Sequence, residues 1–194
     1  MNALIFLFSC FLALYPAQKN STIEDFTLND AVNKENVSLS SFNNKKLVAV
    51  VFTSNYCPYA KLYDERLINL QNKYADQGVQ FLLINSNDPK ASPEDSEEKM
   101  MSKAKAMSYP FPYLLDKEQK AAGILGAQKT PEAFLLTPAA NGFSVIYQGA
   151  IDDNPQSAKD VKSPYFQMAI DNALQNQKIS QAYARPTGCL IRGN

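Results

Sequence analysis

The sequence predicts an α/β fold in which helices flank a mixed central sheet and a β-hairpin comes first. Three observations predict it. The Val-rich apolar run from Lys46 to Phe52 is typical of a strand buried on both faces. A helical pattern and a second apolar run, Val79 to Ser86, follow it, so these two strands should pair in parallel through a right-handed crossover. Later, two strand patterns flank the turn sequence "PAANG", which indicates an antiparallel hairpin at the edge of the sheet.

The other elements follow from local patterns. Residues 26–39 alternate apolar and polar side chains around the turn "NDAVNKEN", which predicts the opening hairpin. The helix between the two buried strands should span 58–77, with Pro58 in its first turn and Gly78 after its end. We expect further elements at these positions: helices over 93–107, 116–126 and 164–177, a short strand over 113–115, and hairpin strands over 132–137 and 143–150.

The chain divides into a signal peptide (residues 1–19), one domain (20–178) and a polar tail without strong periodicity (179–194). Residues 3–15 form an apolar run that is too short to cross a bilayer, and a cleavage site is expected near Ala17. Lipidation of Cys10 and an uncleaved anchor are the alternatives. We therefore expect an exported protein of the periplasm or cell envelope, in contact with a membrane only if Cys10 is lipidated.

Composition excludes several functions. Lys+Arg and Asp+Glu number 19 each and no basic stripe exists, so nucleic acid is not expected as a partner. The chain has no histidine, which removes the usual general base and the imidazole metal ligand. The acidic clusters at 95–98 and 152–153 are interpreted as solvated surface.

Cys57 falls between the first buried strand and the helix that begins with Pro58. The carboxyl ends of such strands are where open α/β sheets bind ligands. Free N–H groups at a helix start stabilise a thiolate, so Cys57 is a candidate nucleophile. The alternative is a small buried residue without chemical function.

Several motifs carry a family resemblance. The segments "EDFTLND…VSLSSF", "VAVVFTSNYCPYA" and "GAQKTPEAFLL" resemble, in this order, the thioredoxin-fold redoxins, which include the alkyl hydroperoxide reductase/thiol-specific antioxidant type. The resemblance runs from about residue 24 to 177. More narrowly, "YQGAIDDN" and "ARPTGCLIR" resemble a bacterial subgroup with a Gly-Cys near the carboxyl end. The resemblance implies a thioredoxin-like fold and a cis peptide bond between Thr130 and Pro131. In the family, this proline packs beside the reactive sulfur, and the backbone before it faces a substrate chain.

A thiol-exchange enzyme needs a second sulfur to resolve its intermediates. Ala60 stands where many such enzymes carry the second cysteine, and Cys10 falls within the signal peptide. Cys189 is left as the candidate resolving thiol, flanked by Arg185 and Arg192, which favour its thiolate. A pair with Cys57 requires Cα atoms within about 7 Å. A free thiol on the tail and an inert structural disulfide are the alternatives.

The residues and the resemblance together predict a thiol–disulfide oxidoreductase or antioxidant redoxin. Its substrate would be a protein or small-molecule disulfide, or a peroxide, and a dithiol protein would donate electrons without any cofactor or metal. A peroxidase is the first alternative. Ser54 matches the hydroxyl of the peroxiredoxin pattern P-x-x-x-T/S-x-x-C, but Val50 replaces its proline. A non-catalytic binding module and a carrier of a soft metal ion on Cys57 and Cys189 are the others.

Overall fold

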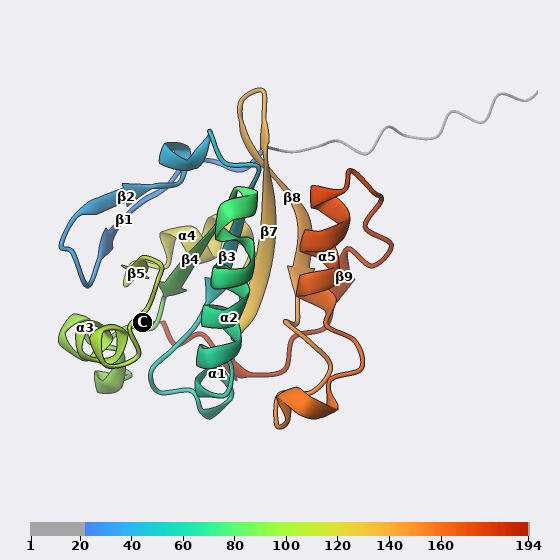
Figure 1. The fold of residues 1–194 in the computed structure, drawn as a ribbon. Helices are drawn as coiled ribbons and strands as arrows, with labels where there is room; N and C mark the ends of the chain where they lie inside the picture. Colours follow the sequence, from blue (N-terminus) through green and yellow to red (C-terminus); the bar gives the residue numbers. More distant parts are fainter. Residues whose placement is uncertain (1–21, 194) are drawn as a thin grey trace, which may run out of the picture.

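A computed structural model of the protein describes residues 22–193 (Figure 1). The expected signal peptide, with Cys10 and the cleavage site near Ala17, lies outside the described residues. Within residues 22–193, no helix is long and apolar enough to cross a membrane.

Eight strands form one mixed sheet in the order β2-β1-β5-β4-β3-β7-β8-β9. Their bounds are β1 Thr27–Asp30, β2 Asn36–Ser38, β3 Leu47–Phe52, β4 Val79–Asn85, β5 Tyr113–Leu115, β7 Glu132–Ala139, β8 Gly142–Gly149 and β9 Tyr183–Ala184. The central strands β5, β4 and β3 are parallel, whereas β7 pairs antiparallel with both β3 and β8. The hairpin β1–β2 joins the sheet through β5. The predicted mixed sheet with its opening hairpin is confirmed.

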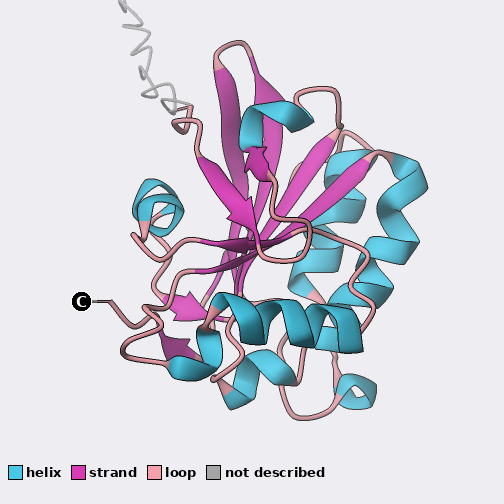
Figure 2. Ribbon diagram, turned by 90° about the vertical axis from the view of Figure 1, so that its left-hand side faces the viewer, coloured by secondary structure: helices cyan, strands magenta, loops and turns pink. Residues whose placement is uncertain are grey.

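Helices cover both faces of the twisted sheet (Figure 2). One face packs against α2 (Asp64–Tyr74), α3 (Glu97–Ala106) and α5 (Tyr165–Leu174), and the other against α4 (Lys120–Leu125) and the 3-10 helix η1 (Leu39–Phe42). The short helices α1 (Pro58–Lys61), η2 (Ala75–Gln77), η3 (Pro93–Asp95) and η4 (Ala158–Asp160) lie in the connections. In β3, Ala49 and Val51 face the first layer, while Val48, Val50 and Phe52 face the second. This two-sided burial explains the continuous apolar run of β3.

The helix expected over 58–77 is divided. It forms α1, α2 and η2, with a break at Leu62 and Tyr63. At the break, the N–H of Leu62 donates to Tyr59 O and the N–H of Tyr63 donates to Ala60 O. These tighter i→i+3 bonds replace the α-helical pattern for one turn. Consequently α1 after Cys57 is a single turn, and its dipole is correspondingly smaller than that of a long helix.

The tail contains ordered structure that its sequence did not predict. β9 pairs in parallel with β8, and a further strand, β10 (Cys189–Leu190), pairs antiparallel with β6 (Lys129–Thr130) as a separate two-stranded sheet. Strands of two residues are too short to produce a recognisable alternation. Figure 1 shows the tail passing below the central strands, from the β8 edge toward α3.

Gly149 fixes the point where the tail joins the sheet. Its φ is +131°, and a Cβ there would overlap the carbonyl group of Ala184. We expect Gly149→Ala to destabilise the protein by roughly 2 kcal/mol, through strain and loss of the β8–β9 pairing. Gly123→Ala is the control, since a Cβ at this α4 position meets nothing within 4 Å. Urea unfolding of both variants checks this, and equal stabilities would contradict the packing assigned to Gly149.

Candidate active site

Cys57 lies in the turn that follows β3. Thr53 to Tyr56 connect the strand to α1, and Cys57 is the N-cap residue, directly before Pro58. The Cys57 N–H donates to Ser54 Oγ at 3.1 Å. Cys57 is fully buried, at 0% exposure. The nucleophile predicted from the sequence therefore sits at the carboxyl edge of the central sheet, but not on its open surface.

The segment before β7 faces this sulfur. The peptide bond between Thr130 and Pro131 is cis, as the resemblance implied. Because Glu132 pairs with Phe52 in the β3–β7 register, Thr130 and Pro131 lie beside the turn that holds Cys57. Thr130 O lies 3.1 Å from Cys57 Sγ. The buried Glu132 carboxylate accepts the N–H groups of Gln128 and Lys129 at 2.9 and 3.0 Å, which fixes β6 in place.

Cys189 is joined to Cys57 by a disulfide across 132 residues, with a Cα–Cα distance of 5.9 Å. The backbone of β10 places it there, since Cys189 is the partner of Thr130 in the β6–β10 register. Cys189 itself is half-buried. The structure thus brings together all four predicted site residues: Cys57, Cys189, Thr130 and Pro131. Their catalytic roles stay predictions.

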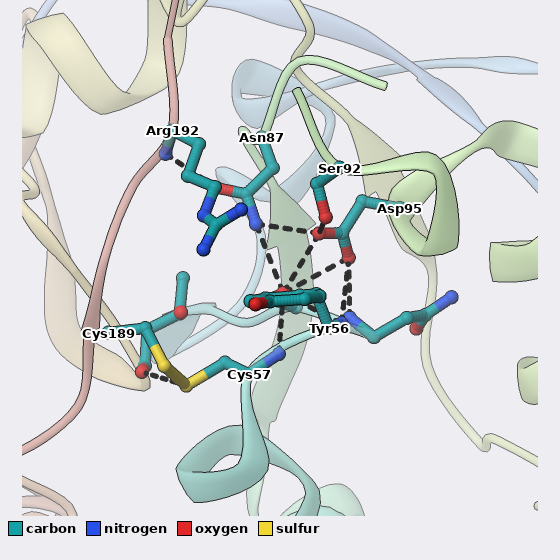
Figure 3. Close-up of a disulfide and its surroundings, with 10 residues drawn as sticks. Tyr56, Cys57, Asn87, Ser92, Asp95, Cys189 and Arg192 are labelled. Carbon is teal, nitrogen blue, oxygen red and sulfur yellow. Dashed lines mark hydrogen bonds between the residues drawn. A yellow bond between two sulfur atoms is a disulfide. The ribbon is translucent and has the colours of Figure 1, made fainter. Parts of the chain in front are cut away.

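Beyond the disulfide, the tail is held a second time by the loop that follows β4 (Figure 3). The Arg192 N–H donates to Asn87 Oδ1 at 2.7 Å, and Arg192 O accepts the Asp88 N–H at 2.8 Å. The Arg192 guanidinium lies over the Tyr56 ring, 4.2 Å from its centre, a cation–π geometry. Cys189 is therefore fixed on both sides, by β6 and by this loop.

A buried carboxylate organises the turn from behind. Asp95, at 0% exposure, accepts hydrogen bonds from the Asn55 N–H and from four side chains: Ser54, Asn85, Asn87 and Ser92. Asn87 Nδ2 also donates to Ser54 Oγ, the acceptor of the Cys57 N–H. One network therefore positions the Cys57 turn and, through Asn87, the tail (Figure 3).

Burial raises the pKa of Asp95, but its hydrogen bonds from Ser92, Asn85, Asn87 and the Asn55 N–H outweigh this effect and lower the pKa overall. Among residues 22–193, no cation forms a salt bridge with Asp95. Hydrogen bonds alone stabilise this charge.

The interpretation of the acidic clusters as solvated surface was wrong for two residues. Asp95 is the network centre just described, and Asp152 is buried against Tyr63 and Arg66. Burial and the Asp152 carboxylate raise the pKa of Tyr63 well above its usual value. The signal that could have found Asp95 is "NSND" at the end of β4, because polar residues there lie at the same sheet edge as Cys57.

Arg66, the one arginine between the expected signal peptide and the tail, is hydrogen-bonded away from Cys57. Arg66 Nη1 donates to Asp152 Oδ2 at 2.7 Å and to Asn154 O at 2.8 Å, and Nη2 donates to Pro155 O. Arg192 stacks on Tyr56.

Residues 18–141 match the family model described as Redoxin, and the chain belongs to this family. The fold is thioredoxin-like, and the match covers Cys57, Thr130 and Pro131 but not the tail. No curated protein shows a significant match. The subgroup with a carboxyl-terminal Gly-Cys stays a prediction.

Several solved structures share this fold. A hypothetical protein from Sinorhizobium meliloti 1021 is 34% identical, with a TM-score of 0.82 over 90% of this chain and 94% of that one. An uncharacterised conserved protein from Geobacillus kaustophilus is 30% identical, also with a TM-score of 0.82, over 90% and 92%. A protein assigned as thiol:disulfide interchange protein DsbE from Chlorobium tepidum is 21% identical, with a TM-score of 0.60 over 80% and 96%, which shows a shared fold alone.

We expect Asp95→Asn to destabilise the protein by about 3 kcal/mol near pH 7, because the new amide group would face hydrogen-bond donors on every side. The folded-state pKa of Asp95 is lowered, so its contribution is present above the unfolded pKa of about 3.9 and is lost as pH falls through the folded value. The difference from the wild type should therefore shrink in acid.

Guanidinium unfolding near neutral pH and at acid pH measures this difference. Asp76→Asn, at an exposed carboxylate of η2, serves as control and should change stability by less than about 0.5 kcal/mol. An Asp95→Asn variant as stable as this control would show that the network does not hold the turn.

Proposed function

We propose that the protein is a thiol–disulfide oxidoreductase with Cys57 as nucleophile and Cys189 as resolving thiol. The observation that carries the proposal is the Cys57–Cys189 disulfide, which lies beside Thr130 and cis-Pro131 at the carboxyl edge of the sheet. Membership of the redoxin family supports it. An inert structural disulfide would not require this placement.

The exchange balances without any cofactor. In the dithiol form, the Cys57 thiolate attacks one sulfur of a substrate disulfide, and the other substrate sulfur leaves as a thiolate that takes up a proton. The Cys189 thiolate then attacks Cys57 Sγ, which forms the Cys57–Cys189 bond and releases the second substrate thiol. Two electrons pass to the substrate, and a dithiol protein returns the pair to the reduced form.

Exchange ranks before peroxide reduction for physical reasons. Val50, where the peroxiredoxin pattern has proline, is a buried residue within β3. The Ser54 hydroxyl is hydrogen-bonded to Asp95, to the Cys57 N–H and to Asn87. Arg66 forms a salt bridge with Asp152. A thiol-dependent peroxidase is the second candidate, favoured by the position of Ser54 relative to Cys57.

Three proteins test the proposal: the wild type, Cys57→Ser and Cys189→Ser, each assayed for reduction of insulin disulfides by dithiothreitol and for peroxide consumption. We expect Cys57→Ser to lose the catalysed rate entirely. Cys189→Ser should lose turnover but form a trapped mixed disulfide at Cys57, detected by peptide mass mapping. Peroxide consumption should stay near the uncatalysed rate.

Two results would count against this assignment. If the wild type and Cys57→Ser both leave insulin reduction at the rate of dithiothreitol alone, and neither consumes peroxide, the result would favour a non-catalytic binding module. Peroxide consumption that requires Cys57, without insulin reduction, would favour the peroxidase.

We also propose that the protein is exported, on the basis of the apolar run at residues 3–15 and the disulfide, which persists in oxidising compartments. Expression of the full sequence followed by cell fractionation and intact mass should give a soluble envelope protein cleaved near Ala17. A lipid mass on Cys10 with membrane partition would identify the lipoprotein alternative. An uncleaved chain in the cytoplasm would overturn export.

A further inference from the structure

The tail occupies the backbone edge of β6 that lies beside the buried nucleophile. Cys189 and Leu190 pair with Thr130 and Lys129, and the Ile191 N–H donates to Gln128 O at 2.9 Å. The Gln128 and Lys129 N–H groups are bonded to Glu132, but without β10 the Gln128 C=O and the Thr130 backbone would lack a strand partner next to Cys57. Such an edge is suited to capture an extended chain. In the structure, the chain's own tail is the strand that fills it.

Gly188 decides how closely the tail approaches. A Cβ at this position would overlap the carbonyl oxygen and carbon of Thr130, and would lie 3.1 Å from Pro131 N. These are backbone atoms, so they cannot move aside as the end of a flexible side chain would. Any strand that places a cysteine opposite Thr130 in this register therefore needs glycine immediately before that cysteine.

The residues after the cysteine meet a different surface. Leu190 and Ile191 line a shallow hollow together with α4 and the segment that follows it, including Ala122, Ala127 and Gln128. Ile191 packs against the core cluster that contains Leu125, whereas Leu190 is 67% exposed. The packing of Ile191 therefore favours an apolar residue at the second position after the cysteine, whereas the backbone of Thr130 and Pro131 leaves no space for a side chain immediately before the cysteine.

We infer that the β6 edge selects partner segments with glycine directly before the cysteine and an apolar residue two positions after it, and that the tail is a built-in competitor that must leave this edge before Cys57 reacts. This inference rests on the proposed oxidoreductase function and adds the shape of the substrate to it. The partner is a protein whose disulfide includes such a segment in extended conformation.

The same competition links resolution to product release. The Cys57 thiolate attacks the cysteine of the bound segment, whose disulfide partner leaves as a thiolate and is protonated. Cys189 then attacks Cys57 Sγ, so the Cys57–Cys189 bond forms and the partner's cysteine leaves as the second thiolate. Since β10 returns to the edge that the segment held, the attack that resolves the mixed disulfide also displaces the reduced product.

The experiment uses full-length Cys189→Ser, which retains the tail but cannot resolve, and two synthetic peptides. One has the sequence of residues 184–193, ARPTGCLIRG, and the other is ARPTACLIRG, each with its cysteine bound to 2-nitro-5-thiobenzoate. Release of the chromophore reports attack by Cys57. We expect the glycine peptide to react at least about tenfold faster than the alanine peptide, whereas free glutathione should attack both equally.

A second variant tests the competition. Gly188→Ala combined with Cys189→Ser should prevent the tail from pairing with β6, so the glycine peptide should react several-fold faster than with Cys189→Ser alone. Thermal unfolding of both variants verifies that the domain is folded. Equal rates in the two variants would show that the tail does not compete for this edge.

The small disulfide 5,5′-dithiobis(2-nitrobenzoate) distinguishes the selectivity of the β6 edge from the reactivity of Cys57. If it reacts with Cys57 while the two peptides react alike, the selectivity inferred for the β6 edge is wrong and the proposed function stands. If Cys57 in Cys189→Ser does not react even with this reagent, the proposed function itself fails.

Discussion

The pairing of β7 with β3 is the constraint on which the site depends. It places Glu132 opposite Phe52, so Thr130 and Pro131, the two residues before Glu132, lie beside the turn that follows β3 and ends at Cys57. The central strands are buried on both faces, so a shift of one residue would move every β7 side chain to the opposite layer of the core. The packing of the core therefore fixes the position of the sulfur as well.

Buried polar groups fix the turn that carries Cys57. The strand ends leave a turn whose N–H groups need acceptors, and Asp95 with Ser54 supplies them from inside the protein. Buried carboxylates are costly unless fully hydrogen-bonded, and this one receives donors from three separate segments. Asn87 extends the same network to Arg192, so the turn and the tail depend on one another for their positions.

Much of this arrangement was predictable from the sequence because it follows from strong periodicity. The buried strands, the hairpins and the place of Cys57 derive from apolar patterns, and the cis bond before Pro131 from the family resemblance. The burial of Asp95 was not predicted, because a carboxylate followed by Ser-Glu-Glu is typical of a solvent-exposed segment. Its partners Asn85 and Asn87 belong to a different element and share no periodic pattern with it. The route of the tail was also not predictable, because β9 and β10 are defined by register with distant strands and not by their own residues.

The two sulfurs of the disulfide differ in their contact with solvent, since Cys57 is fully enclosed and Cys189 is half-buried. A thiolate attacks a disulfide in line with the sulfur–sulfur bond and needs free access to the atom that it strikes. A reductant arriving from solvent therefore meets the outer sulfur first, and the inner one becomes the leaving group. For the proposed oxidoreductase, this unequal burial makes Cys189 the sulfur that an electron donor attacks and Cys57 the sulfur that is released as a thiolate.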